Sequence, residues 1–198
     1  ILPLYCEAGQ LTIANNTFYQ NSFGVELNLA NDCRISHNYF DDSMYSTIKI
    51  ATTVVRDTEI SNNYFVNMQR TQNPMIRFYQ SIDRITIKNN YIEDVNNSAI
   101  HASNNNKFIK IINNSIINVS KYGIVFYGAD NSSIINNTII GSYYNGITIS
   151  GGGPNLIDNN TIIDGIDNSA GIYIGGNSTL INTIKNNYIR GHNYPIRL

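Results

Sequence analysis

The chain has 198 residues, a formal net charge of −1 and an isoelectric point near 6.3, which suits one domain or one elongated repeat array. The near-neutral charge disfavours a nucleic-acid binder, which needs a basic surface to offset phosphates, and no apolar run approaches the roughly 18 residues of a membrane span. Hydrophobic residues make up 42% of the chain, which is too many for a disordered protein.

The sequence opens without an initiator methionine or a signal-peptide pattern, so we expect a mature or excised piece of a longer protein. Residues 1–10 predict one short strand, the remnant of a coil that precedes the repeats described next. Two residue types dominate the composition, with 33 Asn and 34 Ile.

A pair of asparagines recurs along the rest of the chain. The second members of these pairs are 22 to 27 residues apart. A period of this size indicates a repeat architecture, in which each unit buries its apolar face against its neighbours. The pairs are Asn15-Asn16, His37-Asn38 (with His in the first place), Asn62-Asn63, Asn89-Asn90, Asn113-Asn114, Asn136-Asn137, Asn159-Asn160 and Asn186-Asn187.

The residues around each pair repeat as well. An Ile lies two residues before every pair, as Ile13 does, and a large apolar residue lies two residues after it, as Phe18 does. A further alternating run follows, such as Gly146 to Ile149. Each unit therefore predicts three short strands with period-2 alternation, rich in β-branched residues and separated by turns.

The Asn pair falls at one of these turns. Asn tolerates the left-handed backbone conformation and bonds to nearby backbone groups. Stacked in register, the amides of successive units can bond to one another as a ladder. Such a ladder satisfies its own buried polar groups.

These repeats resemble the right-handed parallel β-helix of the pectin-lyase-like superfamily, through the Ile-x-Asn-Asn-x-Ile pattern. The resemblance implies an all-β solenoid with an Asn ladder, in which residues 11–198 form about eight coils of three strands. We expect one domain over 1–198. Its open ends need covers, from segments outside this sequence or from a second copy of the chain.

The alternation assigns one side chain per coil to the outside of the strand that follows the longest loop. In the superfamily, the sheet that these strands form is the floor of the substrate-binding groove. Tyr79 and Tyr127 occupy a second outward position, two residues further along. The first outward column comprises Glu26, Lys49, Arg77, His101, Val125, Thr148, Tyr173 and Arg197.

The column suggests a groove for a glycan, in particular an acidic one. Lys and Arg hold carboxylates, and β-elimination of a uronate needs a base for the C5 proton and a cation that neutralises the carboxylate. Lys49, Arg77 and His101 are the candidates for these catalytic roles, because crowded cations depress the pKa of a Lys or His base. The candidate substrate-binding residues are Glu26, Tyr79, Tyr127 and Tyr173.

A structural interpretation of the same residues stays open, in which Glu26 and Lys49 form an ordinary cross-strand ion pair on a solvated face. Among superfamily members, Ca²⁺ is the neutraliser in some lyases, but the groove column lacks their acidic ligand set. Asp41-Asp42 and Glu93-Asp94 are expected to form turns or a weak cation site rather than a hydrolytic pair. We therefore predict no protein metal site and leave Ca²⁺ optional.

Two classes of function remain. The first is an extracellular or cell-surface protein that binds or degrades a polysaccharide, as a uronate lyase. The second is a non-catalytic solenoid, such as an adhesin, a phage tail-spike shaft or a filament unit. Long loops on one side would distinguish an enzyme from a shaft. The longest loops are expected around 68–74, 95–98 and 165–170, and the first two precede Arg77 and His101.

Overall fold

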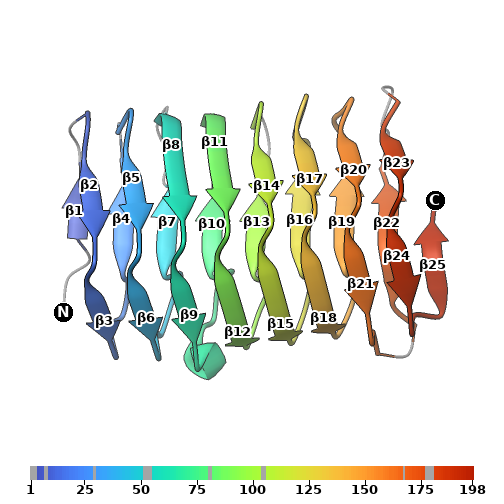
Figure 1. Ribbon diagram of the computed structural model, residues 1–198, viewed down its shortest axis with the longest axis horizontal. Coiled ribbons are helices and arrows are strands. Elements are labelled where there is room, and N and C mark those ends of the chain that lie inside the picture. Colours follow the sequence, from blue (N-terminus) through green and yellow to red (C-terminus); the bar gives the residue numbers. More distant parts are fainter. Residues whose placement is uncertain are drawn as a thin grey trace.

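The protein is described by a computed structural model that covers residues 4–6 (backbone only), 9–28, 30–50, 55–79, 82–103, 106–166, 168–176 and 181–198. Three parallel β-sheets build a right-handed β-helix, and the coils lie side by side along the long axis (Figure 1). One short 3-10 helix, Met68–Arg70, is the one helix in the described residues. No described helix has the length and apolarity to cross a bilayer.

Each coil contributes one strand to each sheet. The nine-stranded sheet contains β1 (Leu4–Cys6), β4 (Val25–Leu27), β7 (Ile48–Ile50), β10 (Ile76–Phe78), β13 (Ile100–Ala102), β16 (Ile124–Tyr127), β19 (Ile147–Ser150), β22 (Ala170–Gly175) and β25 (Tyr194–Arg197). One eight-stranded sheet contains β2 (Thr12–Ala14), β5 (Arg34–Ser36), β8 (Val55–Ser61), β11 (Ile82–Lys88), β14 (Lys110–Ile112), β17 (Ser133–Ile135), β20 (Leu156–Asp158) and β23 (Thr183–Lys185). The other contains β3 (Thr17–Tyr19), β6 (Tyr39–Asp41), β9 (Tyr64–Val66), β12 (Tyr91–Val95), β15 (Ser115–Val119), β18 (Thr138–Ser142), β21 (Thr161–Ile163) and β24 (Tyr188–Arg190).

The repeating apolar residues form the interior, as the alternation predicts. Ile35, Ile60 and Ile87 are fully buried, and each is the register partner of the next. Phe18, Phe40 and Phe65 stack with ring centroids 4.6 and 4.8 Å apart. Every coil thus places the same kind of side chain above the last, so that burial is continuous along the axis.

The two members of each Asn pair have different tasks, and both were expected. The first member turns the chain with a left-handed backbone, for example φ 54° at Asn113. The second member points inward and forms the ladder. The side-chain amide of Asn114 donates to Asn137 Oδ1 (3.0 Å) and to the Ile87 carbonyl (3.0 Å), while its own Oδ1 accepts from the side chain and backbone of Asn90.

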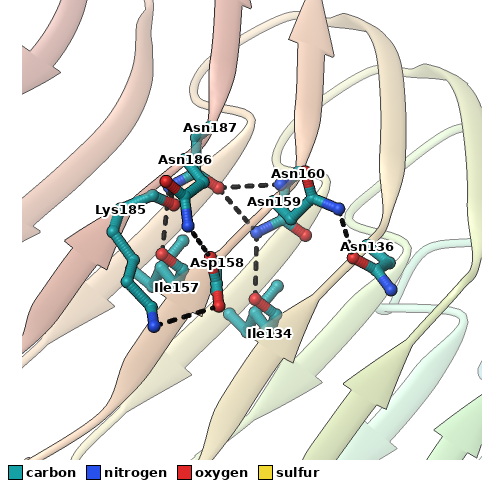
Figure 2. A network of polar contacts seen from close by, with 9 residues as sticks. All are labelled: Ile134, Asn136, Ile157, Asp158, Asn159, Asn160, Lys185, Asn186 and Asn187. Carbon is teal, nitrogen blue, oxygen red and sulfur yellow. Dashed lines mark hydrogen bonds and ion pairs between the residues drawn. The ribbon is translucent and has the colours of Figure 1, made fainter.

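Figure 2 shows the ladder at the C-terminal coils. Asn160 donates to Asn187 Oδ1 (2.9 Å) and to the Ile134 carbonyl (2.9 Å). Outside the ladder, the exposed first members and flanking charges also pair from coil to coil, as Asn159 does with Asn136 and Lys185 with Asp158.

A second, shorter polar ladder lies where the chain enters the sheet of β2. The Asn106 and Asn155 oxygens accept from the backbone amides of Ile82 (3.1 Å) and Ser132 (3.0 Å). The Ser132 hydroxyl accepts from the Ile109 amide (3.0 Å). This turn is also repeated, but with mixed residue types.

Replacing a ladder amide is predicted to cost far more than replacing its exposed neighbour. Asn114→Ala leaves the partners of a buried amide unsatisfied, so we expect the free energy of unfolding to fall by about 2–4 kcal/mol. Asn113→Gly keeps the left-handed turn and should change stability by less than about 1 kcal/mol. Urea unfolding followed by circular dichroism measures both, and equal losses would contradict the ladder's role.

Candidate functional site

The predicted outward column exists as a register column on the nine-stranded sheet. Lys49 is the register partner of both Glu26 and Arg77, and Arg77 is also the partner of His101. The column then continues through Val125, Thr148 and Tyr173 to Arg197. Since parallel strands lie about 4.8 Å apart, one or two sugar residues would span several of these side chains.

Glu26 and Lys49 form a cross-strand ion pair. Lys49 Nζ lies 2.8 Å from Glu26 Oε1, and the two side chains are only 24% and 14% exposed. The ammonium also lies 5.6 Å from the centroid of the Tyr79 ring and 6.0 Å from that of Phe23. An ammonium that already pairs with a carboxylate of the protein is less available to neutralise the carboxylate of a substrate.

Arg77 is fixed by an aromatic ring and an amide. Its guanidinium carbon lies 4.1 Å from the centroid of the Tyr79 ring, a favourable cation–π arrangement. Nη1 donates to Asn73 Oδ1 (2.9 Å), while the buried Nε has no hydrogen-bond partner among the described residues. These contacts hold the Arg77 side chain in place, although they do not use its Nε–H group.

His101 is an uncharged group at neutral pH. Burial, and secondarily the positive charge of Arg77, lower the pKa of His101 from 6.5 to about 4. Its ring packs edge-on against Tyr127, with centroids 5.2 Å apart. A neutral imidazole can accept a proton, although the lowered pKa also makes it a weaker base.

Arg77 and His101 border the same small pocket, of about 250 Å³. Lys121 and Tyr122 line it too, together with residues of the two long loops around 68–74 and 95–98. These loops therefore lie where the sequence analysis expected them. The described residues that line the pocket include two cations and a neutral imidazole, and none of them is a carboxylate.

Beyond His101 the sheet is covered by tyrosines. We use the name tyrosine cluster for Tyr122, Tyr127, Tyr144 and Tyr173. The Tyr122 and Tyr144 rings lie 5.2 Å apart, and burial, followed by the nearby phenols of the other three, raises the pKa of Tyr122. Val125 points outward by register, yet it is fully buried. Side chains of this face must therefore cover it.

The acidic pairs form turns in the structure. Asp42 and Asp94 adopt left-handed backbone conformations, with φ 52° and 55°. Their carboxylates accept from neighbouring coils, Asp42 from Arg70 (3.3 Å) and Asp94 from Asn118 (3.2 Å). Within the described part of the chain, no group of three or more His, Cys, Asp or Glu is placed so that it could hold a metal ion.

Two contributors to the pocket were missed by the sequence analysis. Asn73 positions Arg77, and Lys121 adds the second cation. Both lie in turns whose conformation the repeat does not specify. Lys121 had one usable signal, because it lies four residues before Val125, which was expected in the outward column.

The neutral state of His101 predicts a stability that depends on pH. The folded state disfavours the protonated ring, while the unfolded chain binds that proton below about pH 6.5. Protonation of His101 should therefore not affect the free energy of unfolding above about pH 6.5. The free energy of unfolding should fall as the pH drops from about 6.5 to about 4. His101→Gln should remove this component of the decline, measured by urea unfolding at pH 7 and 4.5. An NMR titration giving His101 a pKa of 6.5 or more would contradict the account.

Comparisons with solved structures find other β-helices. The crystal structure of the periplasmic alginate epimerase AlgG aligns with a TM-score of 0.65 and 14% identity, over 96% of this chain and 50% of that one. A structure of the Streptococcus pneumoniae surface protein and adhesin PfbA aligns with a TM-score of 0.54 and 15% identity, over 88% of this chain and 68% of that one. A second structure of this surface adhesin gives a TM-score of 0.57 and 14% identity, over 98% and 62%.

At these identities the neighbours establish similarity of fold alone. The chain spans half the length of the epimerase and about two thirds of that of the adhesin. No curated protein matches it significantly in sequence. Residues 74–196, more than half of the chain, match the family model described as a right handed beta helix region. The chain therefore belongs to the right-handed beta helix family.

Proposed function

We propose that this protein binds an acidic polysaccharide, of the polyuronate class, across the outer face of the nine-stranded sheet. The observation that carries the proposal is the pocket that Arg77 and Lys121 line, in which none of the described lining residues is a carboxylate. Its charge suits a sugar carboxylate. Arg77 is held by Tyr79 and Asn73, so little side-chain freedom remains to be lost on binding.

The tyrosine cluster supplies the rest of the surface. Tyrosine combines a broad apolar ring with a polar hydroxyl, which suits a sugar ring with its hydroxyl groups. Tyr173 on β22 lies in the same register column as Arg77 on β10, and Tyr127 on β16 lies two residues beyond Val125 of that column. A polysaccharide running across the strands would meet the cations first and the tyrosines next.

Elimination is the reaction that this site would support. His101 would take the proton at C5 and Arg77 would neutralise the neighbouring carboxylate. Cleavage of the C4–O bond would then leave a C4–C5 double bond, and the departing oxygen would take up a proton from water. The neutral imidazole has the proton-accepting form. One structural neighbour is an alginate epimerase. Inversion at the carbon next to a uronate carboxylate also requires that a base remove the proton of that carbon.

Non-catalytic adhesion is the second candidate, and the Glu26–Lys49 pair favours it. With Lys49 engaged by a carboxylate and His101 a weak base, the geometry supports binding more strongly than turnover. Two of the structural neighbours are structures of a surface adhesin. With either function we propose a location at the cell surface or in the extracellular space, which the periplasmic and surface neighbours support.

The test measures binding and cleavage of polyuronate oligosaccharides. Arg77→Ala removes a charged hydrogen-bond donor, so we expect affinity in calorimetry to fall about 10- to 100-fold. Lys49→Ala should have a much smaller effect, because Lys49 is already paired. Affinity should also weaken with salt, as exposed charge attraction is screened. Lys110→Ala, which removes an exposed cation on a different sheet, is the matched control and should bind normally.

Catalysis is read separately, by the ultraviolet absorbance of the unsaturated product. Turnover that disappears in His101→Ala while binding persists would support the elimination mechanism. Binding without any product, in wild-type protein shown to be folded, would support the adhesive function. Equal binding by wild type and Arg77→Ala would overturn the site itself.

A further inference from the structure

A larger hollow, of about 510 Å³, lies on the outer face of the sheet of β2, where β8, β11 and the segment before β14 meet. Arg84, Thr86 and Phe108 are among the residues that line it. Because this is a different sheet from that of Arg77 and His101, the hollow is independent of the site proposed above. We refer to it as the Phe108 pocket.

Phe108 occupies a conformation that costs an aromatic residue strain. Its φ is 53°, and bulky residues rarely adopt the left-handed region. Neighbouring coils mostly place residues that tolerate it at this turn, such as Asp57 (φ 52°) and Asn131 (φ 49°). The Phe108 ring is nevertheless 46% exposed and stacks on no ring within the described chain. Neither packing nor backbone geometry therefore accounts for an aromatic residue here.

Arg84, one of the lining residues, is held by ion pairs. Arg84 donates to Asp57 through Nε (2.7 Å) and Nη2 (2.9 Å), and Nη1 donates to Asp83. These bonds use the edges of the guanidinium and fix its plane. The bond to Asp57 raises the pKa of Arg84 and lowers that of Asp57. Both groups therefore stay charged and paired across the working pH range.

A row of hydrogen-bonding groups crosses the pocket beside Phe108. Thr86 is the register partner of both Glu59 and Lys110, so the three lie on successive strands about 4.8 Å apart. They provide a carboxylate, a hydroxyl and an ammonium. Among the described residues, Arg84 pairs with Asp57 and Asp83, and Glu59 pairs with Lys88 (2.7 Å). Together with Lys110, the cations and carboxylates at the pocket therefore balance.

We propose that the Phe108 pocket binds a neutral saccharide. The exposed ring of Phe108 stacks against the apolar face of a sugar ring, and the row of Glu59, Thr86 and Lys110 hydrogen-bonds the hydroxyls. An apolar platform with a few fixed polar groups is typical of small-ligand sites. The two sites differ in net charge: the residues around this pocket are balanced in charge, whereas the Arg77 pocket is cationic. The protein thus has a second glycan site with a different preference.

The test titrates neutral hexasaccharides of glucose (β-1,4 and α-1,4), xylose and mannose into the protein, followed by calorimetry. We expect at least one to bind, and Phe108→Asn to weaken that binding at least tenfold. Asn accepts the left-handed backbone, so this variant should fold with an unchanged or higher melting temperature. Phe108→Trp should retain binding, as should Tyr19→Asn, which removes a 60% exposed aromatic residue on a different sheet.

Arg77→Ala keeps the Phe108 pocket intact and should bind the neutral sugar as wild type does, which separates this result from the polyuronate experiment. The proposal is overturned if none of the four hexasaccharides binds, or if folded Phe108→Asn binds as well as wild type. Loss of neutral-sugar binding in Arg77→Ala would place that sugar on the nine-stranded sheet and would overturn the proposal as well.

Discussion

The buried asparagine amide is the interaction on which the rest of this structure depends. An amide inside an apolar core must have hydrogen-bond partners, and here they come from the coils on both sides, as Asn90 and Asn137 do for Asn114. A coil that slipped by one residue would lose these bonds and turn its Ile side chains outward. The ladder therefore fixes both the register of the strands and the face on which every other residue lies.

That fixed register turns single residues into columns. The sequence places Glu26, Lys49, Arg77 and His101 far apart, yet each is the register partner of the next. Fixed proximity has two different consequences. Where charges are opposite, as in Glu26 and Lys49, they pair and are satisfied. Where they are not, as at Arg77 and His101, a cation and a neutral imidazole are left facing a pocket.

The repeating features could be predicted from the sequence, because a period-2 strand and a recurring Asn pair fix the direction of each side chain. The order of the column from Glu26 to Arg197 followed from this. The burial of Val125 did not, since the alternation predicts which way a side chain points but not what covers it. The second ladder was missed because Asn106, Ser132 and Asn155 share a task but not a residue type. Phe108 was missed because aromatic residues are not typical of a left-handed turn.

The most direct test of the account is a crystal structure with a polyuronate hexasaccharide bound. The account predicts electron density for the sugar across β10, β13 and β16 on the nine-stranded sheet, with one carboxylate hydrogen-bonded to Arg77 and sugar rings over Tyr127. Density for the acidic sugar on either eight-stranded sheet, away from Arg77, would contradict it.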